Sequence, residues 1–600
     1  MIRVADYIMS KIEKQGVNHV FYVPGGQCVY LTDALRRAEN IEGISVHHEQ
    51  AAAMAALSYS LYNDNFGACL VTTGCAGTNT VTGVLHAWQD SIPCIFISGQ
   101  QNYEQTIAYS GLPLRQVGVQ EADIVSIVKP ITKYAVMLTN PEDVAFELEK
   151  AIHIATTGRK GPVWIDVPLN IQNAMIDEEN VKHYEAEESK PLSLSAEDEA
   201  FVLKSIEEAK RPVLFAGQGI RSAGAIEELK RFAEKTRIPV VFTRYSTDMM
   251  EYESEYNYGI VCSVGANRYA NFIIQNADLV LNVGCRLSID TTGPEQDKFA
   301  REAKVIAVDI DEVEHRKKGV KIDKFVHADA KLFFGKMLTD NVKVTDQWWI
   351  DKCTHWKEIF KPDWTEAEKQ DLLDIKYFYE KLSEKLPDNS VVLSDAGMTG
   401  AAVSANCHLR KGSRLLHAYA QGEMGYVLPG SLGAACASDG MIFAITGDGS
   451  FMMNLQELQT VVRNQFNIKI IINNNNGYSG VRHGQKAHFR GKSIGTDPSN
   501  GIDFPDFGKV AEAFGIPYCK IECTNQLEEK LEKMLSVEGP FICEVMCDPE
   551  QFDLHNALVM YGKRKFGFRP IEDQSPFIDR EVFFEEMIVE PMETSYGKPM

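Results

Sequence analysis

The sequence predicts an α/β protein of three doubly wound parallel-sheet domains. Short apolar runs alternate with helical periods along nearly the whole chain, and this alternation is typical of parallel βαβ units whose sheets are covered on both faces. The length of 600 residues exceeds what one hydrophobic core supports, since domains usually hold about 100–200 residues. Two polar, charged stretches, 183–197 and 340–370, interrupt the alternation and predict linkers.

These two stretches set the expected domain boundaries. They separate an N-terminal domain (1–185), a middle nucleotide-binding-like domain (190–345), a C-terminal domain (365–555) and a tail (556–600). The chain begins with an amphipathic helix in residues 1–16, and without an uninterrupted apolar stretch this helix is not a signal peptide. Examples of the strands that we expect are residues 20–23, 68–72, 92–98, 163–167, 213–215, 279–283, 305–308, 391–394, 442–446, 469–472 and 541–545.

Composition narrows the class of protein. The net charge of −22, from 61 basic and 83 acidic side chains, argues against binding to nucleic acid or to an anionic membrane. No segment reaches the ~20 apolar residues that a membrane span needs. The 13 cysteines are scattered without a CxxC pair, which favours reduced core thiols over a zinc site. We therefore expect a soluble, cytoplasmic protein.

A Gly-Asp-Gly-Ser motif, residues 447–450, follows the predicted strand 442–446. Ligands of open parallel sheets bind beyond the carboxyl ends of the strands. Small residues there let backbone N–H groups approach a phosphate, but the carboxylate of Asp448 would repel one. The conflict disappears if Asp448 holds a divalent metal that in turn holds the phosphate, as Mg²⁺ commonly does.

Four asparagines, residues 473–476, end the next predicted strand. The amide oxygen of Asn475 can supply a second metal ligand, and the backbone carbonyl of Gly477 a third, because glycine lets the chain turn inward. Asn473 and Asn474 then cap or turn the chain. An Asn-rich loop in a plain strand–turn–helix unit is the alternative, and Gly-Asp-Gly alone would not exclude it.

The two motifs together resemble the thiamine-diphosphate motif, since Asn475 follows Asp448 by 27 residues. The resemblance extends over roughly residues 1–550 and points to acetolactate synthase-type enzymes. The segments that carry it are VFYVPGG (20–26), HHEQAAAMAA (47–56), VTTGCAGTN (71–79), DSIPCIFISGQ (90–100), VQEADIV (119–125), ATTGRKGPVWIDVP (155–168), RPVLFAGQGI (211–220), NADLVLNVGCRLSIDTTG (276–293) and GEMGYVLPGSLGAA (422–435).

The resemblance implies thiamine diphosphate and Mg²⁺ as cofactors and assigns residue roles. Glu49 would hydrogen-bond the cofactor's pyrimidine ring and help to activate it, Gln120 would line the active site, and Met424 would wedge beneath the cofactor. For Glu49 alone, a helix N-terminal carboxylate is the structural alternative. The cofactor-binding residues that it implies are Pro24, Gly25, Gly26, Glu49, Gly397, Met398, Thr399, Gly422, Met424, Gly447, Asp448, Gly449, Ser450, Asn475, Gly477 and Tyr478, with Asp448, Asn475 and Gly477 at the metal.

The sequence departs from this family at the acceptor pocket. The tryptophan that narrows the pocket in acetolactate synthases aligns near Gly484. Its absence, with Arg482, His483 and Lys486 close by, favours a bulkier, oxygen-rich or anionic acceptor. A flexible surface loop is the alternative.

The middle domain and the tail depart as well. Of two arginines near the family's FAD site, Arg286 remains and Asp290 replaces the other, so that both a bound FAD and an empty nucleotide fold stay open. The segment 563–591 resembles thiamine-dependent enzymes of bacterial surface-sugar pathways. Its basic side chains either face a diphosphate or belong to a solvated, strapped-down tail.

The leading hypothesis is a carboligase. It would decarboxylate pyruvate or a similar 2-keto acid and transfer the acyl unit to an acceptor carbonyl, such as a nucleotide-linked keto-deoxysugar. The alternatives are acetolactate synthase, a simple 2-keto acid decarboxylase or C–C lyase, and a non-catalytic binding protein that kept the fold. The resemblance further implies a homodimer or homotetramer with active sites at the subunit interface.

Overall fold

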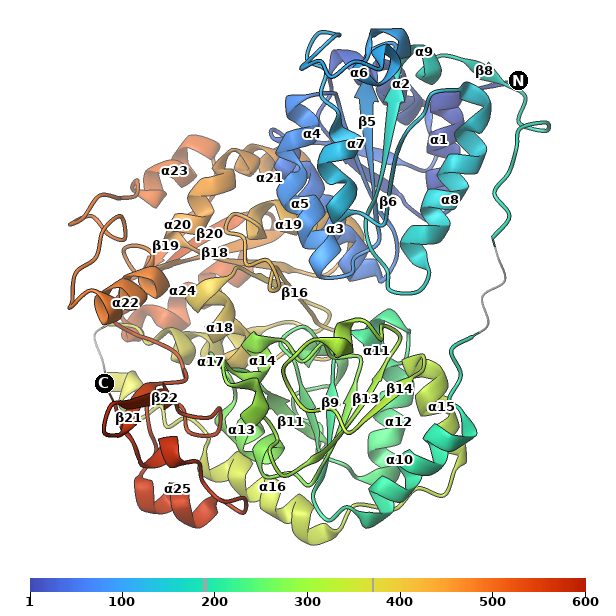
Figure 1. The fold of residues 1–600 in the computed structure, drawn as a ribbon. Coiled ribbons are helices and arrows are strands. Elements are labelled where there is room, and N and C mark those ends of the chain that lie inside the picture. The colour runs from blue at the N-terminus through green and yellow to red at the C-terminus, as the bar shows by residue number, and fades with distance from the viewer. Residues whose placement is uncertain (187–190, 370–371, 600) are drawn as a thin grey trace.

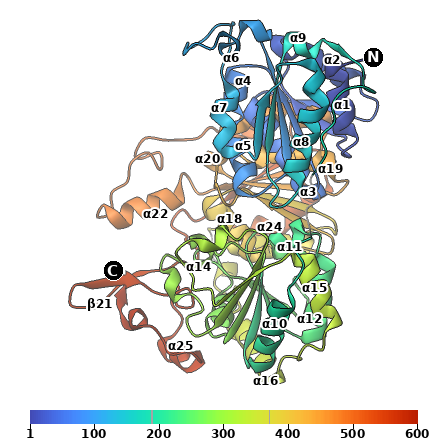
Figure 2. The same ribbon diagram turned by 45° about the vertical axis from the view of Figure 1, so that its right-hand side comes forward.

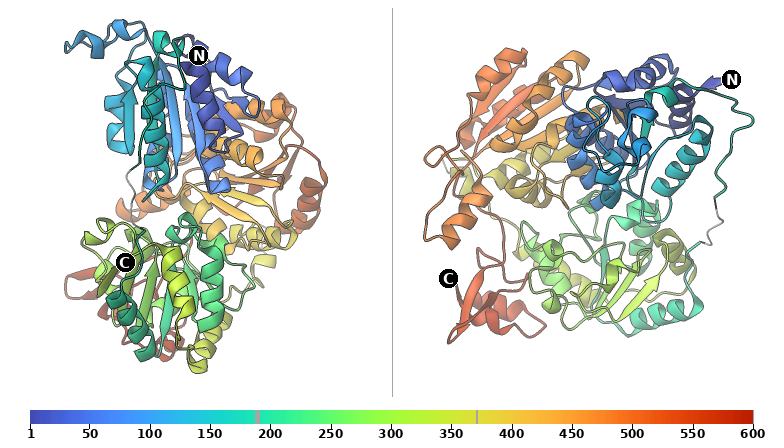
Figure 3. Two further views of the ribbon diagram at one scale, coloured as in Figure 1. Left: turned by 90° about the vertical axis from the view of Figure 1, so that its right-hand side faces the viewer. Right: turned by 45° about the horizontal axis from the view of Figure 1, so that its top comes forward.

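The computed structural model describes residues 1–186, 191–369 and 372–599. Three six-stranded sheets, all parallel, form three α/β bodies (Figure 1). The predicted fold class is confirmed. The N-terminal body lies at the top of Figure 1, the C-terminal body to its left and the middle body below, and Figure 3 shows the three from two other sides. No helix among these described residues is long and apolar enough to cross a membrane.

The first sheet has the strand order β3-β2-β4-β5-β7-β6. Its strands are β2 (His19–Tyr22), β3 (Glu42–Ser45), β4 (Gly67–Val71), β5 (Cys94–Gln100), β6 (Tyr134–Met137) and β7 (Val163–Pro168). The helices of this body are α1 (Val4–Glu13), α2 (Val29–Arg37), α3 (Glu49–Asn63), α4 (Cys75–Asn79), α5 (Val81–Gln89), α6 (Ile107–Ser110), α7 (Ile124–Val128), α8 (Val144–Thr156) and α9 (Leu169–Gln172). Helix α1 is the amphipathic helix expected at the N-terminus.

The middle sheet has the order β11-β10-β9-β12-β13-β14. Its strands are β9 (Pro212–Ala216), β10 (Val240–Phe242), β11 (Asn257–Ile260), β12 (Leu279–Val283), β13 (Lys304–Asp309) and β14 (Lys324–His327). The helices are α10 (Ala196–Glu208), α11 (Gly219–Ser222), α12 (Ile226–Thr236), α13 (Arg268–Gln275), α14 (Ile289–Thr292), α15 (Ala330–Thr339) and α16 (Gln347–Ile359).

The third sheet has the order β16-β15-β17-β18-β20-β19. Its strands are β15 (Val391–Ser394), β16 (Arg414–His417), β17 (Ile442–Gly447), β18 (Ile468–Asn474), β19 (Tyr518–Ile521) and β20 (Phe541–Met546). The helices are α17 (Ile375–Lys385), α18 (Gly397–Asn406), α19 (Val427–Ala437), α20 (Asp448–Phe451), α21 (Leu458–Asn464), α22 (Ser479–His488), α23 (Phe507–Phe514) and α24 (Leu527–Ser536).

The two predicted linkers differ in the structure. In 183–197, the described residues before α10 form no helix or strand, and residues 187–190 lie outside the described residues. In 340–370, by contrast, α16 buries Trp349 and Trp356 in the middle-domain core. Trp349 also donates its indole N–H to the Pro212 carbonyl at 3.0 Å. This part of the stretch therefore belongs to the middle body, beyond the predicted end at 345, and its last residue, 370, lies outside the described ranges.

The tail packs against the middle body. It forms the strands β21 (Leu558–Gly562), β22 (Lys565–Phe568) and β23 (Lys598–Pro599), and the helix α25 (Arg580–Glu586). The amide of Gln275 on α13 donates to the Glu572 carboxylate at 2.7 Å, and Phe583 joins the middle-domain core. Figure 2 shows α22 and the β21 hairpin projecting to the same side of the molecule.

The tail corrects one expectation about its basic side chains. Arg569 does not face a ligand, because it is buried, pairs with the Asp573 carboxylate at 3.2 Å and donates to the Gly597 carbonyl at 2.7 Å. Lys563, Arg564 and Lys565 are exposed at the turn of the β21–β22 hairpin.

The N- and C-terminal bodies meet through helices α3 and α19, which pack at very short range. Small residues make this contact possible: α3 contributes an alanine-rich face, and α19 contributes Gly430 and Gly433. The hydroxyls of Ser58 and Tyr426 hydrogen-bond across the contact at 2.6 Å. The two helices thereby fix how the first and third sheets are placed relative to each other.

Replacing Gly433 by alanine should lower the free energy of unfolding by about 1–3 kcal/mol, the usual cost of overpacking. The added Cβ would lie 2.0 Å from the carbonyl oxygen of Ala55, a backbone atom that cannot move alone. Calorimetry checks this as a fall in Tm. The control Gly335→Ala, in α15, meets nothing within 4 Å and should leave Tm unchanged or raise it. An unchanged Tm for Gly433→Ala would mean that the helices separate easily.

Candidate active site

The centre of the candidate site is Asp448, directly after strand β17. One carboxylate oxygen accepts the Gly449 N–H at 2.7 Å and the other accepts the Gly477 N–H at 2.9 Å. The residue is 2% exposed, and burial raises the pKa of Asp448 to about 6 against the effect of these hydrogen bonds. A cation beside this carboxylate would relieve that cost.

Asn475 lies just past β18, the strand next to β17. Its side-chain nitrogen donates to the Ser479 hydroxyl at 3.1 Å, whereas its buried oxygen has no hydrogen-bond partner among the described residues. An orphaned amide oxygen near a buried carboxylate fits a hard cation. Asn474 turns the chain as expected, because its side-chain oxygen accepts the Asn476 N–H at 3.0 Å; its amide also donates to the Glu544 carboxylate at 2.6 Å. Asn473 instead lies within β18 and donates to the Tyr379 hydroxyl, so it neither caps nor turns the chain.

Gly477 lies in the turn between β18 and α22. Its φ of 136° and its contact with the Thr496 carbonyl, which a Cβ would approach to 2.0 Å, require glycine. The Gly477 carbonyl accepts the Ser479 N–H at 3.1 Å, which leaves one lone pair for a further ligand.

The residues that could bind a metal ion at this site offer three different types of oxygen donor. The described residues contain no group of three or more His, Cys, Asp or Glu side chains that could hold a metal. Asp448, Asn475 and the Gly477 carbonyl instead offer one carboxylate, one amide and one backbone oxygen. Such a set suits Mg²⁺ when phosphate oxygens and water complete an octahedron.

Around this centre, glycines stand where the backbone packs closely or takes a left-handed conformation. A Cβ on Gly449 would come within 2.1 Å of the Tyr478 ring, and Gly397 begins α18 with a φ of 69°. The Ser450 hydroxyl accepts the Gly425 N–H at 2.6 Å and ties this motif to the loop that carries Gly422 and Met424. The C-terminal body thus brings together one group of predicted site residues: Gly397, Met398, Thr399, Gly422, Met424, Gly447, Asp448, Gly449, Ser450, Asn475, Gly477 and Tyr478.

The N-terminal body carries the other group. Glu49 begins α3, is half-buried, and accepts a hydrogen bond from the Asn79 amide at 2.8 Å. Pro24, Gly25 and Gly26 follow β2, where a Cβ on Gly25 would lie 2.4 Å from the Thr72 side chain. Gln120 lies in an exposed loop with a φ of 62°. Across the described part of the chain, no hydrogen bond or ion pair joins this group to the first.

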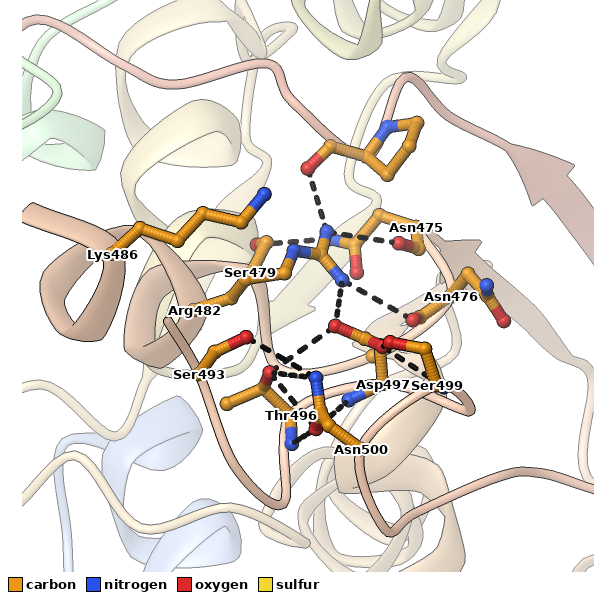
Figure 4. Close-up of polar contacts among 12 residues, drawn as sticks. Asn475, Asn476, Ser479, Arg482, Lys486, Ser493, Thr496, Asp497, Ser499 and Asn500 are labelled. Atoms are coloured by element: carbon orange, nitrogen blue, oxygen red, sulfur yellow. Dashed lines mark hydrogen bonds and ion pairs between the residues drawn. The ribbon is translucent and has the colours of Figure 1, made fainter. Parts of the chain in front are cut away.

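The role expected for Arg482, on helix α22, is wrong, as its contacts in Figure 4 show. The guanidinium is 4% exposed and donates to the carbonyls of Asn475 and Asn476 at 3.3 Å and of Pro549 at 2.6 Å. It therefore stabilises the turn that holds the metal donors and does not face an acceptor. Lys486 pairs with Glu550 at 3.0 Å, and open space surrounds the position where Gly484 would carry a Cβ.

A charged cluster beside Met424 escaped the sequence analysis. The His86 ring is fully buried, contacts the Glu423 carboxylate and lies 3.1 Å from the Asp90 carboxylate. Burial disfavours the charged ring, but the two carboxylates outweigh it and raise the pKa of His86 to about 10. The cluster holds the Met424 loop against α5. His86 and Asp90 lie four residues apart at the end of α5, but nothing in the local sequence indicates that Glu423, 337 residues after His86, packs against them.

A cavity of about 700 Å³ opens between the three bodies. Arg286 and Asp290, singled out from the sequence, line its middle-domain wall, and Gly397, Met398 and Gly422 line its C-terminal wall. The cavity therefore reaches from the middle sheet to residues of the candidate cofactor site.

Comparisons with known proteins agree with this geometry. Thiamine pyrophosphate enzyme family models match residues 2–127 (N-terminal TPP binding domain), 200–337 (central domain) and 395–545 (C-terminal TPP binding domain). The acetolactate synthase large subunit of Corynebacterium glutamicum is 33% identical over 544 residues, 88% of this chain and 84% of that protein. The Escherichia coli K12 acetolactate synthase isozyme 2 large subunit is 30% identical over 558 residues, 91% and 95% of the two chains. The probable acetolactate synthase large subunit of Methanocaldococcus jannaschii is 30% identical over 570 residues, 91% and 92%.

The three parallel-sheet bodies, the site and these matches define a thiamine pyrophosphate-dependent enzyme. Within that class, the chain belongs to the acetolactate synthase-like family.

Replacing Asn475 by alanine should weaken the Mg²⁺-dependent binding of thiamine diphosphate to the protein, because it removes the orphaned oxygen. Isothermal titration should show at least a tenfold weaker Mg²⁺-dependent binding, since metal ligands contribute several kcal/mol. The Tm of the cofactor-free variant should stay within a few degrees of the parent, as only one hydrogen bond to Ser479 is lost. Asn467→Ala, at an exposed position before β18, is the control. Unchanged binding in Asn475→Ala would exclude Asn475 as a ligand.

Proposed function

We propose that the enzyme decarboxylates pyruvate or a similar 2-keto acid and joins the acyl unit to an acceptor carbonyl. The observation that carries this proposal is the buried Asp448 carboxylate beside the orphaned Asn475 oxygen, in a chain that also presents Glu49 at the start of α3. The balanced reaction takes a 2-keto acid, an aldehyde or ketone and a proton. It breaks the bond to the carboxylate, releases CO₂ and forms one carbon–carbon bond.

In this proposal, Asp448, Asn475 and the Gly477 carbonyl hold Mg²⁺, and the open space beside Gly397 leaves room for a diphosphate. Thiamine diphosphate, when bound, supplies the carbon that adds to the donor and takes up its electrons. The chain's own residues bind it, orient it and move one proton.

Glu49 is the residue that we assign to the proton step. The Asn79 amide orients its carboxylate, which accepts hydrogen bonds when ionised and donates one when protonated. A carboxylate in hydrogen-bond reach of the cofactor's ring nitrogen shares a proton with it and thereby changes the basicity of the ring. Met424, 38% exposed in the single chain, offers an apolar side chain for the cofactor to cover, and Gln120 lines the acceptor side.

Acetolactate synthesis from two molecules of pyruvate is the second candidate, because the similar proteins are acetolactate synthase large subunits. The open space at Gly484 favours a larger acceptor, such as a nucleotide-linked keto-deoxysugar. A simple 2-keto acid decarboxylase or C–C lyase would use the same donor chemistry without the acceptor.

FAD has a place at the middle-domain end of the large cavity. There a Cβ on Gly219 would lie 2.6 Å from the Gly284 backbone, so both glycines allow a close backbone approach. The absorbance of the purified protein between about 350 and 500 nm tests for bound flavin. A spectrum without flavin bands would mean that the protein does not carry FAD.

The first experiment is pyruvate consumption with Mg²⁺ and thiamine diphosphate, followed by NMR identification of the products. We expect rapid consumption only when a suitable acceptor is present, and we would test a panel of nucleotide-linked keto-sugars. Rapid formation of acetolactate from pyruvate alone would favour the second candidate. Free acetaldehyde as the sole product under all conditions would favour the decarboxylase.

We further propose a homodimer or homotetramer in which Glu49 of one subunit meets Asp448 of another. Among the described residues, no hydrogen bond or ion pair joins the two groups of site residues within one chain. Glu49→Gln should still bind the cofactor but lose turnover by at least 100-fold, the usual range for a proton-transfer residue, and Asp448→Asn should lose cofactor binding.

Mixing these two inactive variants tests the shared site. Random reassociation makes half of the dimers mixed, and one of the two sites in each mixed dimer is intact, so about a quarter of the parental activity should return. No recovery after confirmed subunit exchange would place the whole site within one chain. Mixing each variant with itself is the control.

A further inference from the structure

Beyond the cofactor site, the structure indicates how the acceptor is recognised. We propose that Arg244 binds an anionic group, a carboxylate or a phosphate, of the acceptor in the inter-domain cavity. This inference rests on the proposed carboligation and names the class of its second substrate. Arg244 follows strand β10 and lines the cavity between the three bodies.

Arg244 is a buried cation with unused donors. The residue is 5% exposed, and its Nε and one of its terminal nitrogens are buried without a hydrogen-bond partner among the described residues. A desolvated, unpaired guanidinium is costly. It persists in a fold when it has a ligand to bind, and strained or unsatisfied groups gather at functional sites.

The other arginines of the cavity wall are already engaged. Arg159 lies 2.8 Å from the carboxylates of Asp311 and Glu314, and Arg221 lies 2.8 Å from that of Asp248. Arg286 donates to the backbone of Gln89 at 3.2 Å.

The carboxylates near Arg244 do not neutralise it. Asp90 accepts the Tyr245 hydroxyl at 2.8 Å and contacts His86, and Asp290 accepts the Cys262 thiol at 3.0 Å. Asp553 is buried and feels the charge of Arg244. No carboxylate among the described residues lies within ion-pair distance, 4.0 Å, of Arg244.

Aromatic side chains hold the guanidinium in place. Its central carbon lies 4.5 Å from the centre of the Tyr419 ring, and Tyr245 packs edge-on against Tyr419 with ring centres 5.5 Å apart. Tyr419 also begins the loop that carries Gly422 and Met424. The guanidinium is therefore fixed to the element that would contact the cofactor.

The cavity is large enough for a small anionic substrate. Its volume of about 700 Å³ lies within the range of small-molecule sites. A planar guanidinium with free N–H donors binds carboxylates and phosphates through paired hydrogen bonds. Because Gly397, Met398 and Gly422 line the same cavity, an anion bound to Arg244 would keep its carbonyl near the candidate cofactor site.

Three small aldehydes test the inference with pyruvate as donor: acetaldehyde (neutral), glyoxylate (carboxylate) and glycolaldehyde phosphate (phosphate). The full-length enzyme with Mg²⁺ and thiamine diphosphate should use at least one charged acceptor with a higher kcat/KM than acetaldehyde. Arg244→Gln should lower kcat/KM for that acceptor by about 10- to 100-fold, the effect of one charge-assisted hydrogen-bond pair, and change acetaldehyde by less than about threefold. Arg244→Lys should recover part of the loss.

Arg316→Gln, an exposed arginine of the middle body, is the matched control and should change none of the three values. If only glyoxylate shows the Arg244 effect, the recognised group is a carboxylate; if only glycolaldehyde phosphate does, it is a phosphate. Equal losses for charged and neutral acceptors, or none, would overturn the inference.

Direct binding separates this inference from the proposed reaction. Isothermal titration with oxalate and with ADP measures anion binding without turnover. At least one of them should bind Arg244→Gln about tenfold more weakly than the parent. If pyruvate is never consumed but this difference is found, the proposed reaction fails and the anion site stands. If oxalate and ADP each bind Arg244→Gln as tightly as they bind the parent, the proposed anion site is wrong.

Discussion

The close contact between α3 and α19 determines the geometry on which the rest of the molecule depends. Alanines on one helix and glycines on the other let two backbones approach so closely that no side chain separates them. This contact sets the angle between the first and third sheets and leaves the middle body to close the cavity.

The site combines several groups that a stable core would avoid. Asp448 is a buried carboxylate, Asn475 has an orphaned oxygen, and Arg244 is a buried cation without a counter-charge. Each lowers the stability of the ligand-free fold, and each fits a ligand of opposite or complementary character. Neighbouring charged groups, by contrast, have partners in the protein. Arg482 contacts three backbone carbonyls, and His86 lies between two carboxylates.

Periodicity and strand-end motifs predicted the fold class and the central strands, because these are apolar on both faces. The strands that it missed, such as β3, β14 and β16, are short and carry Glu42, Lys324 or Arg414. Asp448 and Asn475 could be found because each directly ends an apolar strand. Arg244, His86 and Glu423 could not, since nothing in their local sequence indicates which distant segments will surround them. The role of Arg482 was misjudged because its carbonyl partners belong to the backbone, which the sequence does not reveal.

The attachment of the tail has a consequence for biosynthesis. Gln275 and Asn271 on α13 are buried, and their amides find partners in Glu572 and Gln574, 297 and 303 residues later in the chain. At about 5–20 residues per second, a ribosome needs roughly 15–60 s to make that interval. During this time the middle body is already synthesised, but the face that it turns to the tail stays uncovered. The nascent chain therefore passes through a period in which this face is open to other proteins, and the period ends once the tail segment has been made.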